Sequence, residues 1–440
     1  MDIHSFFEDT KLKHLPKKHL SKLHALAKEY YPDATISNEH TLLNFYQELR
    51  TTAKKSKREK QKLKEAEQLV LNIAGVMHGN VVPASSPKGR ERTIARAWHK
   101  LAGQPAVEGT PRVLSARQAQ QILLEGNEDF KLKLTNYQSH NAPLERPTQY
   151  DIVILACSDA RNVFSLFSDF RDKNILVVHV AGNSYSKHPK EHAKIDAALM
   201  MLKKGGTLVV AGHEKCGAVD ACIKHYSPES KSLVSVIDSV DIRPTVPRIT
   251  NPYQCNIVNQ AARLAKHSTV IVNGIKVVPV SLDFTRGEHC FQHLGEGKEP
   301  ELVIDLRASV FSHIEAARLA GKDLSKQEVH TIVVCDPTDL GRFTDPRVIF
   351  NAGMNDIFVA SFNGSTLDPT AIGSIEYALE HVENVRFSGH VLFLHSDPRV
   401  IEKVSAQLLA DSKIAAQKTN NGKTITRSHF TELDGSIRFY

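Results

Sequence analysis

Three side chains that can bind a metal ion stand in two short segments of this chain of 440 residues. Cys157 opens the segment 157–161, with the sequence CSDAR, and His213 and Cys216 begin and end the sequence HEKC. Thiolate sulfur and imidazole nitrogen are ligands that zinc prefers. Structural zinc usually has four protein ligands, whereas catalytic zinc has three and keeps one position open. The set predicts a catalytic zinc site, with Asp159 as the nearest candidate for a fourth ligand.

Both segments follow runs of residues that are typical of buried β-strands. Residues 151–156 and 207–211 are short and apolar, and each run ends where candidate ligands begin. In an open α/β sheet, ligands bind in the crevice outside the carboxyl ends of parallel strands. We therefore expect both segments to face one site.

The acidic and basic neighbours of the ligands predict how a water molecule would be activated. Zinc lowers the pKa of bound water and turns it into a nucleophile, although two thiolates make the ion a weaker Lewis acid than three imidazoles would. Asp159 is placed to accept a hydrogen bond from this water and orient it. Arg161 can pair with Asp159 through its planar fork, which keeps the carboxylate ionised and limits its movement.

The motifs that contain these residues resemble those of the β-class carbonic anhydrases. The family motifs are Cys-x-Asp-x-Arg, His-x-x-Cys-Gly and Ala-Gly-Asn. In this chain they are formed by Cys157, Asp159 and Arg161, by His213, Cys216 and Gly217, and by Ala181, Gly182 and Asn183.

Weaker matches extend the resemblance to about residues 113–300. Segments 124–130, 256–260 and 277–294 resemble the family's Gly-Asn-x-x-Phe helix, its later Asn-Val-x-x-Gln helix and its closing strand pair. The chain also departs from the family. Asn162 and Val163 stand where Val-Pro is usual, and His179 stands where an arginine usually precedes the Ala-Gly-Asn loop. These departures concern the substrate pocket and not the metal ligands.

The resemblance implies an α/β fold with a mainly parallel sheet and flanking helices, and it implies an enzyme. The implied reaction is the reversible hydration of carbon dioxide to bicarbonate and a proton by zinc-bound hydroxide. Asp159 and Arg161 would be catalytic, and Gly182, Asn183 and Gly217 would line the substrate pocket. By family analogy, Asp159 could instead bind zinc directly in a closed resting form. The sequence does not distinguish this form from the one in which Asp159 orients the water.

Other interpretations stay open for the same residues. A single free cysteine is usually a buried, inert residue, and Asp159 with Arg161 could form a structural ion pair. The spacing of the motifs and the position of the candidate ligands at strand ends both favour the zinc site over these interpretations. The same site could hydrolyse carbonyl sulfide or carbon disulfide. The protein could also be a non-catalytic scaffold that acts through its basic N-terminal region.

Residues 308–440 repeat the pattern of residues 113–307 without its chemistry. Cys335 ends a strand-like run, and His395 follows it by sixty residues, whereas His213 follows Cys157 by fifty-six. The counterparts of the aspartate, the arginine and the second cysteine are Pro337, Asp339 and Pro398. The helix-like segment 373–379 matches the family's Ser-Ile-Glu-Tyr-Ala helix. Because subunits of family dimers share active-site walls, we predict a degenerate copy that pairs with the catalytic half as a pseudo-dimer.

Residues 1–112 differ in character and predict a small all-α domain with a linker. Helical apolar spacing is present in residues 12–31, 41–50 and 66–77. The run 54–64 has seven basic residues and one acidic residue, in a chain of net charge +7. Such a run is more often the solvated face of a helix than a binding site for an acidic partner, nucleic acid or anionic lipid.

Length and composition set the outer limits. A chain of this length holds about two or three domains. The sequence has no secretory signal and no apolar run long enough for a transmembrane helix. Six cysteines form no dense framework, which favours the cytoplasm, although a shell-enclosed compartment or dedicated export is also compatible. The layout is similar to carboxysomal shell carbonic anhydrases, whose histidine and second cysteine are further apart. A homo-oligomer is a further expectation.

Overall fold

The structure is a computed structural model. It describes residues 116–138, 147–162, 174–186, 188, 191–285, 290–319, 322–341, 343, 345–382, 385, 388–411, 424–431 and 436–439. The predicted helical domain, its linker and the basic run at 54–64 lie outside the described residues, as does Val163. Both sheets described below belong to one compact unit, Pro111–Ile314 with Asp323–Tyr440.

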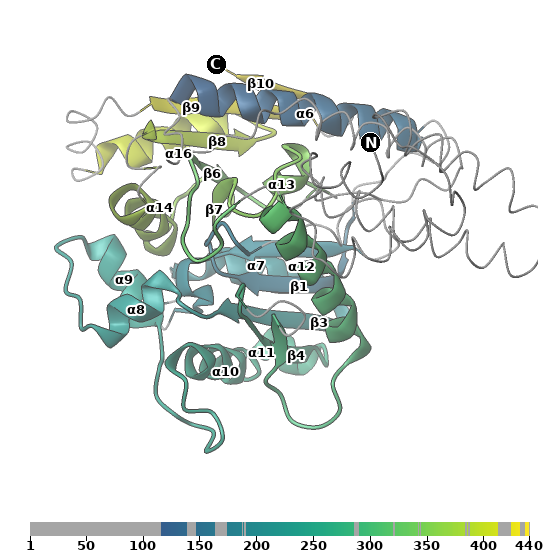
Figure 1. Ribbon diagram of the computed structural model, residues 1–440, viewed down its shortest axis with the longest axis vertical. Helices are drawn as coiled ribbons and strands as arrows, with labels where there is room; N and C mark the ends of the chain where they lie inside the picture. Colours follow the sequence, from purple (N-terminus) through teal and green to yellow (C-terminus); the bar gives the residue numbers. More distant parts are fainter. Residues whose placement is uncertain are drawn as a thin grey trace, which may run out of the picture. The chain divides into compact units, whose positions relative to one another are not determined.

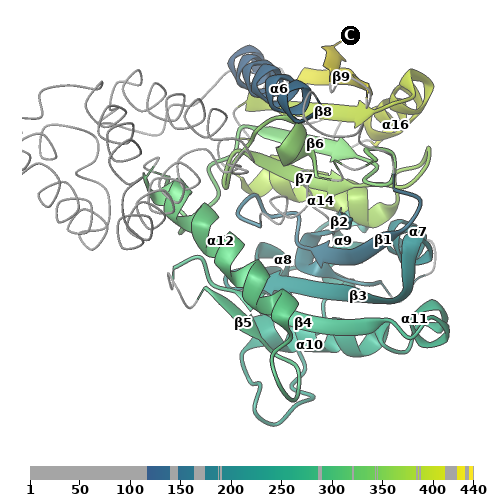
Figure 2. The same cartoon turned by 90° about the vertical axis from the view of Figure 1, so that its right-hand side faces the viewer.

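The first sheet has five strands in the order β2-β1-β3-β4-β5, and only β5 is antiparallel to its neighbour (Figures 1 and 2). The strands are β1 (Tyr150–Ala156), β2 (Ile175–His179), β3 (Leu202–His213), β4 (Lys276–Leu282) and β5 (Phe291–His293). The apolar run of β1 is buried along almost its whole length, as parallel strands covered on both faces are. The predicted mainly parallel α/β fold is thus confirmed, with β1 and β3 containing the two predicted strands.

Short helices join these strands. They are η3 (Ala181–Asn183), α7 (Ala193–Met201), α8 (Gly217–Ile223), α9 (Lys231–Ser239), α10 (Pro252–Leu264) and α11 (Ser268–Val272). The start of α10 shows why a helix begins there, because the Asn251 side chain accepts hydrogen bonds from two backbone N–H groups and Pro252 occupies the first turn. The segment 256–260 lies in α10, and the predicted closing strand pair is β4 with β5.

A second five-stranded sheet follows in the order β10-β9-β8-β6-β7. Its strands are β6 (Thr331–Cys335), β7 (Ile357–Ser361), β8 (His390–His395), β9 (Thr424–Thr431) and β10 (Ser436–Phe439). The helices after β5 are α12 (Glu301–Leu319), α13 (Pro346–Ile349), α14 (Pro369–His381) and α16 (Pro398–Ala410). Read from β7, the strand order is that of the first sheet, and again only the last strand is antiparallel.

Helix α6 (Ala116–Gln138) precedes the first sheet in sequence but packs on the second one (Figure 1). Its residues Phe130 and Leu134 belong to the same buried cluster as Ile349 of α13. The Asn127 amide donates a hydrogen bond to the carbonyl oxygen of Ile349 at 3.1 Å. The helix therefore completes the core of the second half.

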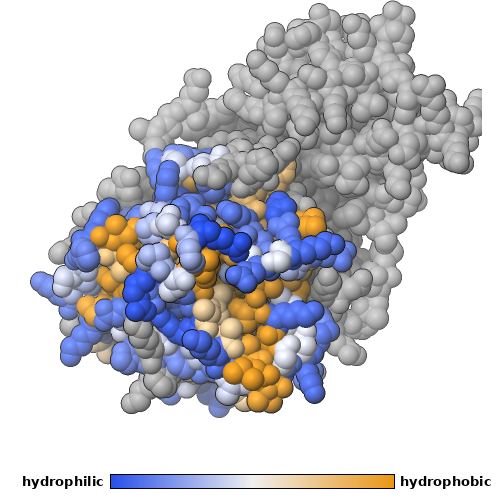
Figure 3. Space-filling model, turned by 90° about the horizontal axis from the view of Figure 1, so that it is seen from below, coloured by the Kyte–Doolittle hydropathy of each residue, from blue (hydrophilic) through white to orange (hydrophobic). Residues whose placement is uncertain are grey.

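The surface of the described part carries apolar side chains among hydrophilic ones (Figure 3). Met200 at the end of α7 and the neighbours Ile271 and Val272 in α11 are the most exposed large hydrophobic residues of this part. None of the described helices has the length and hydropathy needed to cross a membrane.

The start of β8 gives a prediction about pH and stability. His390 is buried and its Nδ1 lies 3.0 Å from the Thr331 hydroxyl, and burial lowers its pKa from 6.5 to about 4. The unfolded chain therefore takes up this proton first as pH falls. The contribution of His390 to the free energy of unfolding is fully present above pH 6.5. It is lost as the pH falls from 6.5 to about 4. The expected loss is about 3 kcal/mol.

Urea unfolding of the full chain from pH 7 to pH 4 measures this loss. His390→Gln keeps a polar partner for Thr331 without titrating, so the variant should lose less stability over this range than the unchanged chain. Equal losses in the two proteins would contradict the assignment.

Candidate metal centre

The three predicted ligands lie together at the carboxyl ends of two neighbouring parallel strands. Cys157 directly follows β1, His213 is the last residue of β3, and Cys216 is the N-cap of α8. One ligand atom from each residue lies within 4.8 Å of the other two, and all three residues are buried. No other such group of His, Cys, Asp and Glu residues occurs among the described residues.

The spacing of the ligand atoms fits zinc. The sulfur atoms of Cys157 and Cys216 are 3.8 Å apart. Two sulfur ligands at about 2.3 Å in a tetrahedral site are about 3.8 Å apart. His213 Nδ1 lies 2.9 Å from the Glu214 carbonyl oxygen, to which it donates. In the neutral ring the lone pair is then on Nε2, and this atom is buried without a hydrogen-bond partner. Such an atom needs an explanation, and a bound metal ion supplies one.

Hydrogen bonds and nearby charges set the protonation of the three candidate ligands. A hydrogen bond from the Cys216 thiol holds the pKa of Cys157 well below its usual range. The same hydrogen bond, together with burial, raises the pKa of Cys216 well above its usual range. Burial opposes protonation of His213, but the charges of Asp159 and Cys157 raise its pKa. Metal binding requires deprotonated ligands, so uptake of an ion should release protons from this group.

Asp159 and Arg161 form a buried pair beside the ligands. The backbone N–H and the Nε of Arg161 both donate to Asp159 Oδ1 at 2.9 Å, and Nη2 donates to Oδ2 at 2.6 Å. Burial opposes ionisation of Asp159, but Arg161 outweighs it and holds the pKa at about 2. The Arg161 guanidinium is also fixed by the Leu324 carbonyl oxygen at 3.1 Å and lies over the Phe284 ring. Asp159 is thus an ionised and rigidly held carboxylate.

The structure shows Asp159 turned toward Arg161 and outside the group of three ligands. Its Oδ2 lies 3.6 Å from His213 Nε2 while accepting from Arg161. This arrangement places a hydrogen-bond acceptor beside the candidate ligands. The closed form, in which Asp159 itself would bind the ion, stays a prediction.

The Ala-Gly-Asn loop lies against Cys157. The Gly182 N–H points to the Cys157 sulfur at 3.3 Å, and the Asn256 amide donates to the Gly182 carbonyl oxygen at 2.9 Å. Gly182 has φ 69° and Asn183 has φ 43°, a region that glycine and asparagine adopt most readily. Asn183 Nδ2 is buried without a hydrogen-bond partner. The structure therefore brings this loop to the ligands.

The third predicted pocket residue, Gly217, touches a side chain from the second half of the chain. A Cβ atom on Gly217 would lie 1.7 Å from the hydroxyl oxygen of Tyr377, which belongs to α14. Burial and the nearby acidic groups of the site raise the pKa of this hydroxyl, so it stays protonated. The sequence pattern of segment 373–379 predicted this helix. It did not predict the contact between Tyr377 and Gly217, because a local pattern does not indicate which helix covers the site.

Gly217→Ala tests this close approach. The added methyl group would overlap the Tyr377 ring and hydroxyl, so we expect a loss of about 1–3 kcal/mol in the free energy of unfolding. The matched measurement is the same substitution in a Tyr377→Ala background, where the overlapping atoms are absent. Urea unfolding should show a smaller cost there, and an equal cost would contradict the placement.

The second half has different chemistry at the corresponding strand ends. Cys335 ends β6 and lies in an apolar cluster, and His395 ends β8 with its Nδ1 accepting from the Asp397 N–H at 2.8 Å. The Gly364 N–H donates to the Asp336 carboxylate at 2.7 Å, much as the Gly182 N–H meets the Cys157 sulfur. Protein hydrogen bonds thus occupy these polar groups.

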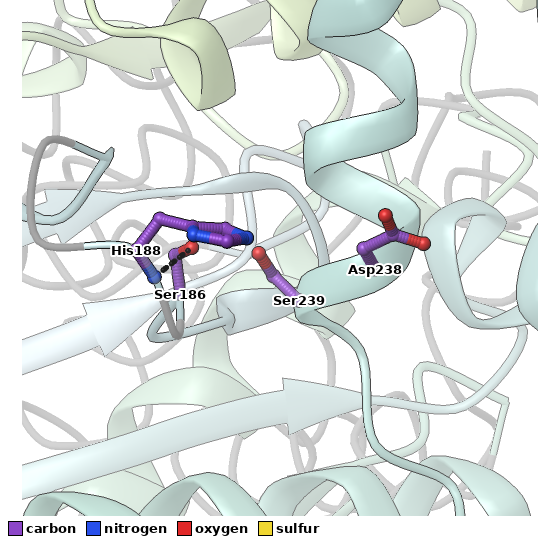
Figure 4. Close-up of a pocket in the computed structure, with 4 residues that line it drawn as sticks. All are labelled: Ser186, His188, Asp238 and Ser239. Atoms are coloured by element: carbon purple, nitrogen blue, oxygen red, sulfur yellow. Dashed lines mark hydrogen bonds between the residues drawn. The ribbon is translucent and has the colours of Figure 1, made fainter.

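The structure also has a pocket of about 260 Å³ (Figure 4). Its lining consists of Ser186, His188, Asp238 and Ser239. Ser186 and His188 follow η3, and the His188 N–H donates to the Ser186 hydroxyl at 3.0 Å. Asp238 and Ser239 end α9. The lining includes none of the predicted site residues.

Comparison with known proteins identifies the segment that carries the ligands. Residues 152–278 match the family model of the carbonic anhydrases. This segment is therefore similar to the carbonic anhydrase family. The matched range contains all three ligands together with Asp159 and Arg161. The resemblance predicted from the motifs is confirmed for this segment. No curated protein matches the chain.

Several solved structures of carbonic anhydrases are similar to part of the chain. The β-carbonic anhydrase CcaA is 19% identical, covering 37% of this chain and 90% of its own, with a TM-score of 0.29. The b-carbonic anhydrase CafA of Aspergillus fumigatus is 19% identical, covering 44% and 98%, with a TM-score of 0.30. A Coccomyxa β-carbonic anhydrase in complex with acetazolamide is 17% identical, covering 39% and 84%, with a TM-score of 0.29.

Proposed function

We propose that this protein is a β-class carbonic anhydrase that binds zinc through Cys157, His213 and Cys216. The reaction is CO₂ + H₂O giving bicarbonate and a proton, and it is reversible. One observation carries the proposal: the buried group of two sulfurs and one unpartnered imidazole nitrogen has the dimensions of a zinc site and lies beside an ionised carboxylate.

When bound, zinc supplies the Lewis acidity that brings the pKa of a water molecule toward neutrality. The side chains around the site orient the water molecule and the substrate. Asp159 accepts a hydrogen bond from a water molecule and aims its lone pair at the carbon of CO₂, and Arg161 prevents Asp159 from turning away. The Asn183 amide and the Tyr377 hydroxyl are donors that can hold oxygen atoms of CO₂ or bicarbonate. Burial keeps bulk water from weakening these interactions.

The second half acts in this proposal as a degenerate copy and a permanent partner. The domains would be residues 1–112, 113–307 and 308–440. The shared strand order of the two sheets supports a duplication, and the Tyr377 contact supports a shared site wall. A covalently linked partner has a high effective concentration, so pairing needs no second chain. A homo-oligomer, a cytoplasmic location and an acidic partner for residues 54–64 stay predictions.

Stopped-flow hydration of carbon dioxide by a sample of measured zinc content tests the proposal. Hydrolysis of carbonyl sulfide and carbon disulfide is measured on the same sample. A hydration rate that scales with zinc content supports carbonic anhydrase activity. Zinc-loaded protein that hydrolyses only the sulfur compounds would support the alternative substrate class. Protein with neither activity, but with salt-sensitive binding of nucleic acid, would favour the scaffold role.

A further inference from the structure

We propose that the second half of the chain positions the metal-ligand loop 157–161, and that His179, braced by Asp345 and Arg347, is the main positioning residue. The inference rests on the proposed zinc site. It assigns a task to a histidine that stands where the related family usually has an arginine.

His179 links the backbone of a metal ligand to the second half. It ends β2, and its Nδ1 lies 3.2 Å from the carbonyl oxygen of Cys157, to which it must donate because a carbonyl only accepts. On the other side of the ring, Nε2 lies 3.1 Å from Asp345 Oδ2 and 3.2 Å from Arg347 Nη1. The backbone N–H of His179 donates to the Ser361 hydroxyl at 2.9 Å.

Asp345 and Arg347 are an unusual pair to find in the interior. Both have 0% exposure, and Arg347 is one of the largest fully buried side chains in the described part. Asp345 caps α13 and accepts from the Arg347 N–H at 2.8 Å, while Arg347 Nε has no partner. A buried ion pair with an unsatisfied donor is weak evidence for stability, since desolvation offsets the attraction. Holding the His179 ring in one orientation is a task that explains the pair.

Two more contacts from the second half reach the same loop. The N–H of Val359, in β7, donates to the Ser158 carbonyl oxygen at 3.3 Å, and the N–H of Asn355 donates to the Ala160 carbonyl oxygen at 3.0 Å. Together with the His179 bond to Cys157, these contacts engage three carbonyl groups within four residues. The orientation of the peptides that carry Cys157 and Asp159 is thus set from the second half.

The physical consequence concerns the metal ligands. The Cys157 sulfur must stay near 3.8 Å from the Cys216 sulfur for both to bind one ion. A rotated Cys157 peptide would carry its side chain away from this position. Groups that support metal ligands from behind typically change metal affinity by about 10–100-fold when they are removed.

The structure also offers a matched control. Lys194 of α7 is buried, and its Nζ contacts both carboxylate oxygens of Asp368 at 2.9 Å and the Thr370 hydroxyl at 2.8 Å. This cluster also joins the first half to the second and is also an ion pair. None of its hydrogen bonds goes to loop 157–161. Its loss should therefore weaken folding without a specific effect on the metal.

The experiment compares full-length His179→Leu, His179→Gln and Lys194→Met with the unchanged chain. Zinc affinity is measured by competition with a chromophoric chelator, and ligand geometry by the visible spectrum of the Co²⁺-substituted proteins. Urea unfolding reports stability. We expect His179→Leu to weaken zinc binding by about 10–100-fold and to change the Co²⁺ spectrum. His179→Gln keeps a side-chain donor and should recover most of the affinity. Lys194→Met should lower the urea midpoint and leave zinc affinity within about twofold.

Unchanged zinc affinity and Co²⁺ spectrum in folded His179→Leu would overturn the inference. If His179→Leu does not fold, Asp345→Asn decides, because it removes the charged group that braces the His179 ring, and an unaltered zinc affinity and Co²⁺ spectrum in that variant would overturn the inference. Equal zinc loss in Lys194→Met would also overturn it, because the effect would then reflect general stability. These readouts do not depend on carbon dioxide hydration, so an inactive but zinc-binding chain would contradict the proposed function alone.

Discussion

Cys157→Ser is expected to remove tightly bound zinc and to abolish carbon dioxide hydration. The hydroxyl of serine does not ionise near neutral pH, whereas the Cys157 thiol has a pKa well below its usual range because Cys216 donates to it. One imidazole and one thiolate would remain, which is too few protein ligands for a stable zinc site. Removal of a group that only supports a metal ligand lowers metal affinity by about 10–100-fold. Removal of a ligand itself should therefore lower zinc affinity by more than about 100-fold. Zinc analysis after dialysis and stopped-flow hydration measure the two losses.

Cys335→Ser is the matched control. Cys335 is also a buried cysteine at the end of a parallel strand, but it lies in an apolar cluster and outside the ligand group. This variant should lose stability through its buried hydroxyl and keep its zinc and its hydration rate per zinc. Retention of full zinc content and activity in Cys157→Ser would contradict the assignment of the ligands.

Asp159→Asn is expected to keep zinc and to lower the hydration rate constant by about 10²–10³-fold. Asparagine has the same shape, but it places an amide where an ionised acceptor stands, and it leaves the buried Arg161 without its counter-charge. Water beside the ligands would no longer be oriented. Stopped-flow hydration at several carbon dioxide concentrations should show the loss in kcat as well as in kcat/KM, with zinc content unchanged.

The chain contains a second aspartate–arginine pair with the same geometry, which serves as the control. Arg399 donates to Asp397 from its backbone N–H at 2.9 Å, from Nε at 3.1 Å and from Nη2 at 2.8 Å. Asp397 is the partly exposed N-cap of α16, Arg399 is exposed, and the pair lies outside the ligand group. Asp397→Asn should leave hydration unchanged. A normal rate in Asp159→Asn would exclude the proposed role of the carboxylate.

Much of the fold and the ligand set could be predicted because the signals are local. Strand β1 is an apolar run of the length of a buried strand, and the ligands follow β1 and end β3. Neighbouring parallel strands bring their carboxyl ends to one place, so two distant segments met as expected. Helix α10 likewise begins at an asparagine cap followed by proline.

The contributions of the second half could not be predicted in the same way. Tyr377 reaches Gly217, and α6 packs on the second sheet, only because of how the two halves pair. In the sequence, His179 is identified only as a departure from the family pattern. Its partner Asp345 is 166 positions away along the chain, so no local pattern predicts their contact. Apolar periodicity identifies a helix or a strand, but it does not report which distant surface the element will contact.

The central claim is that one metal ion is bound by the sulfur atoms of Cys157 and Cys216 and by a His213 nitrogen. X-ray absorption at the zinc edge on the purified full-length chain tests it most directly. We expect one zinc ion per chain with two sulfur scatterers at about 2.3 Å and a histidine nitrogen at about 2.0–2.1 Å. A chain that binds no zinc after reconstitution, or zinc with no sulfur neighbour, would contradict the account.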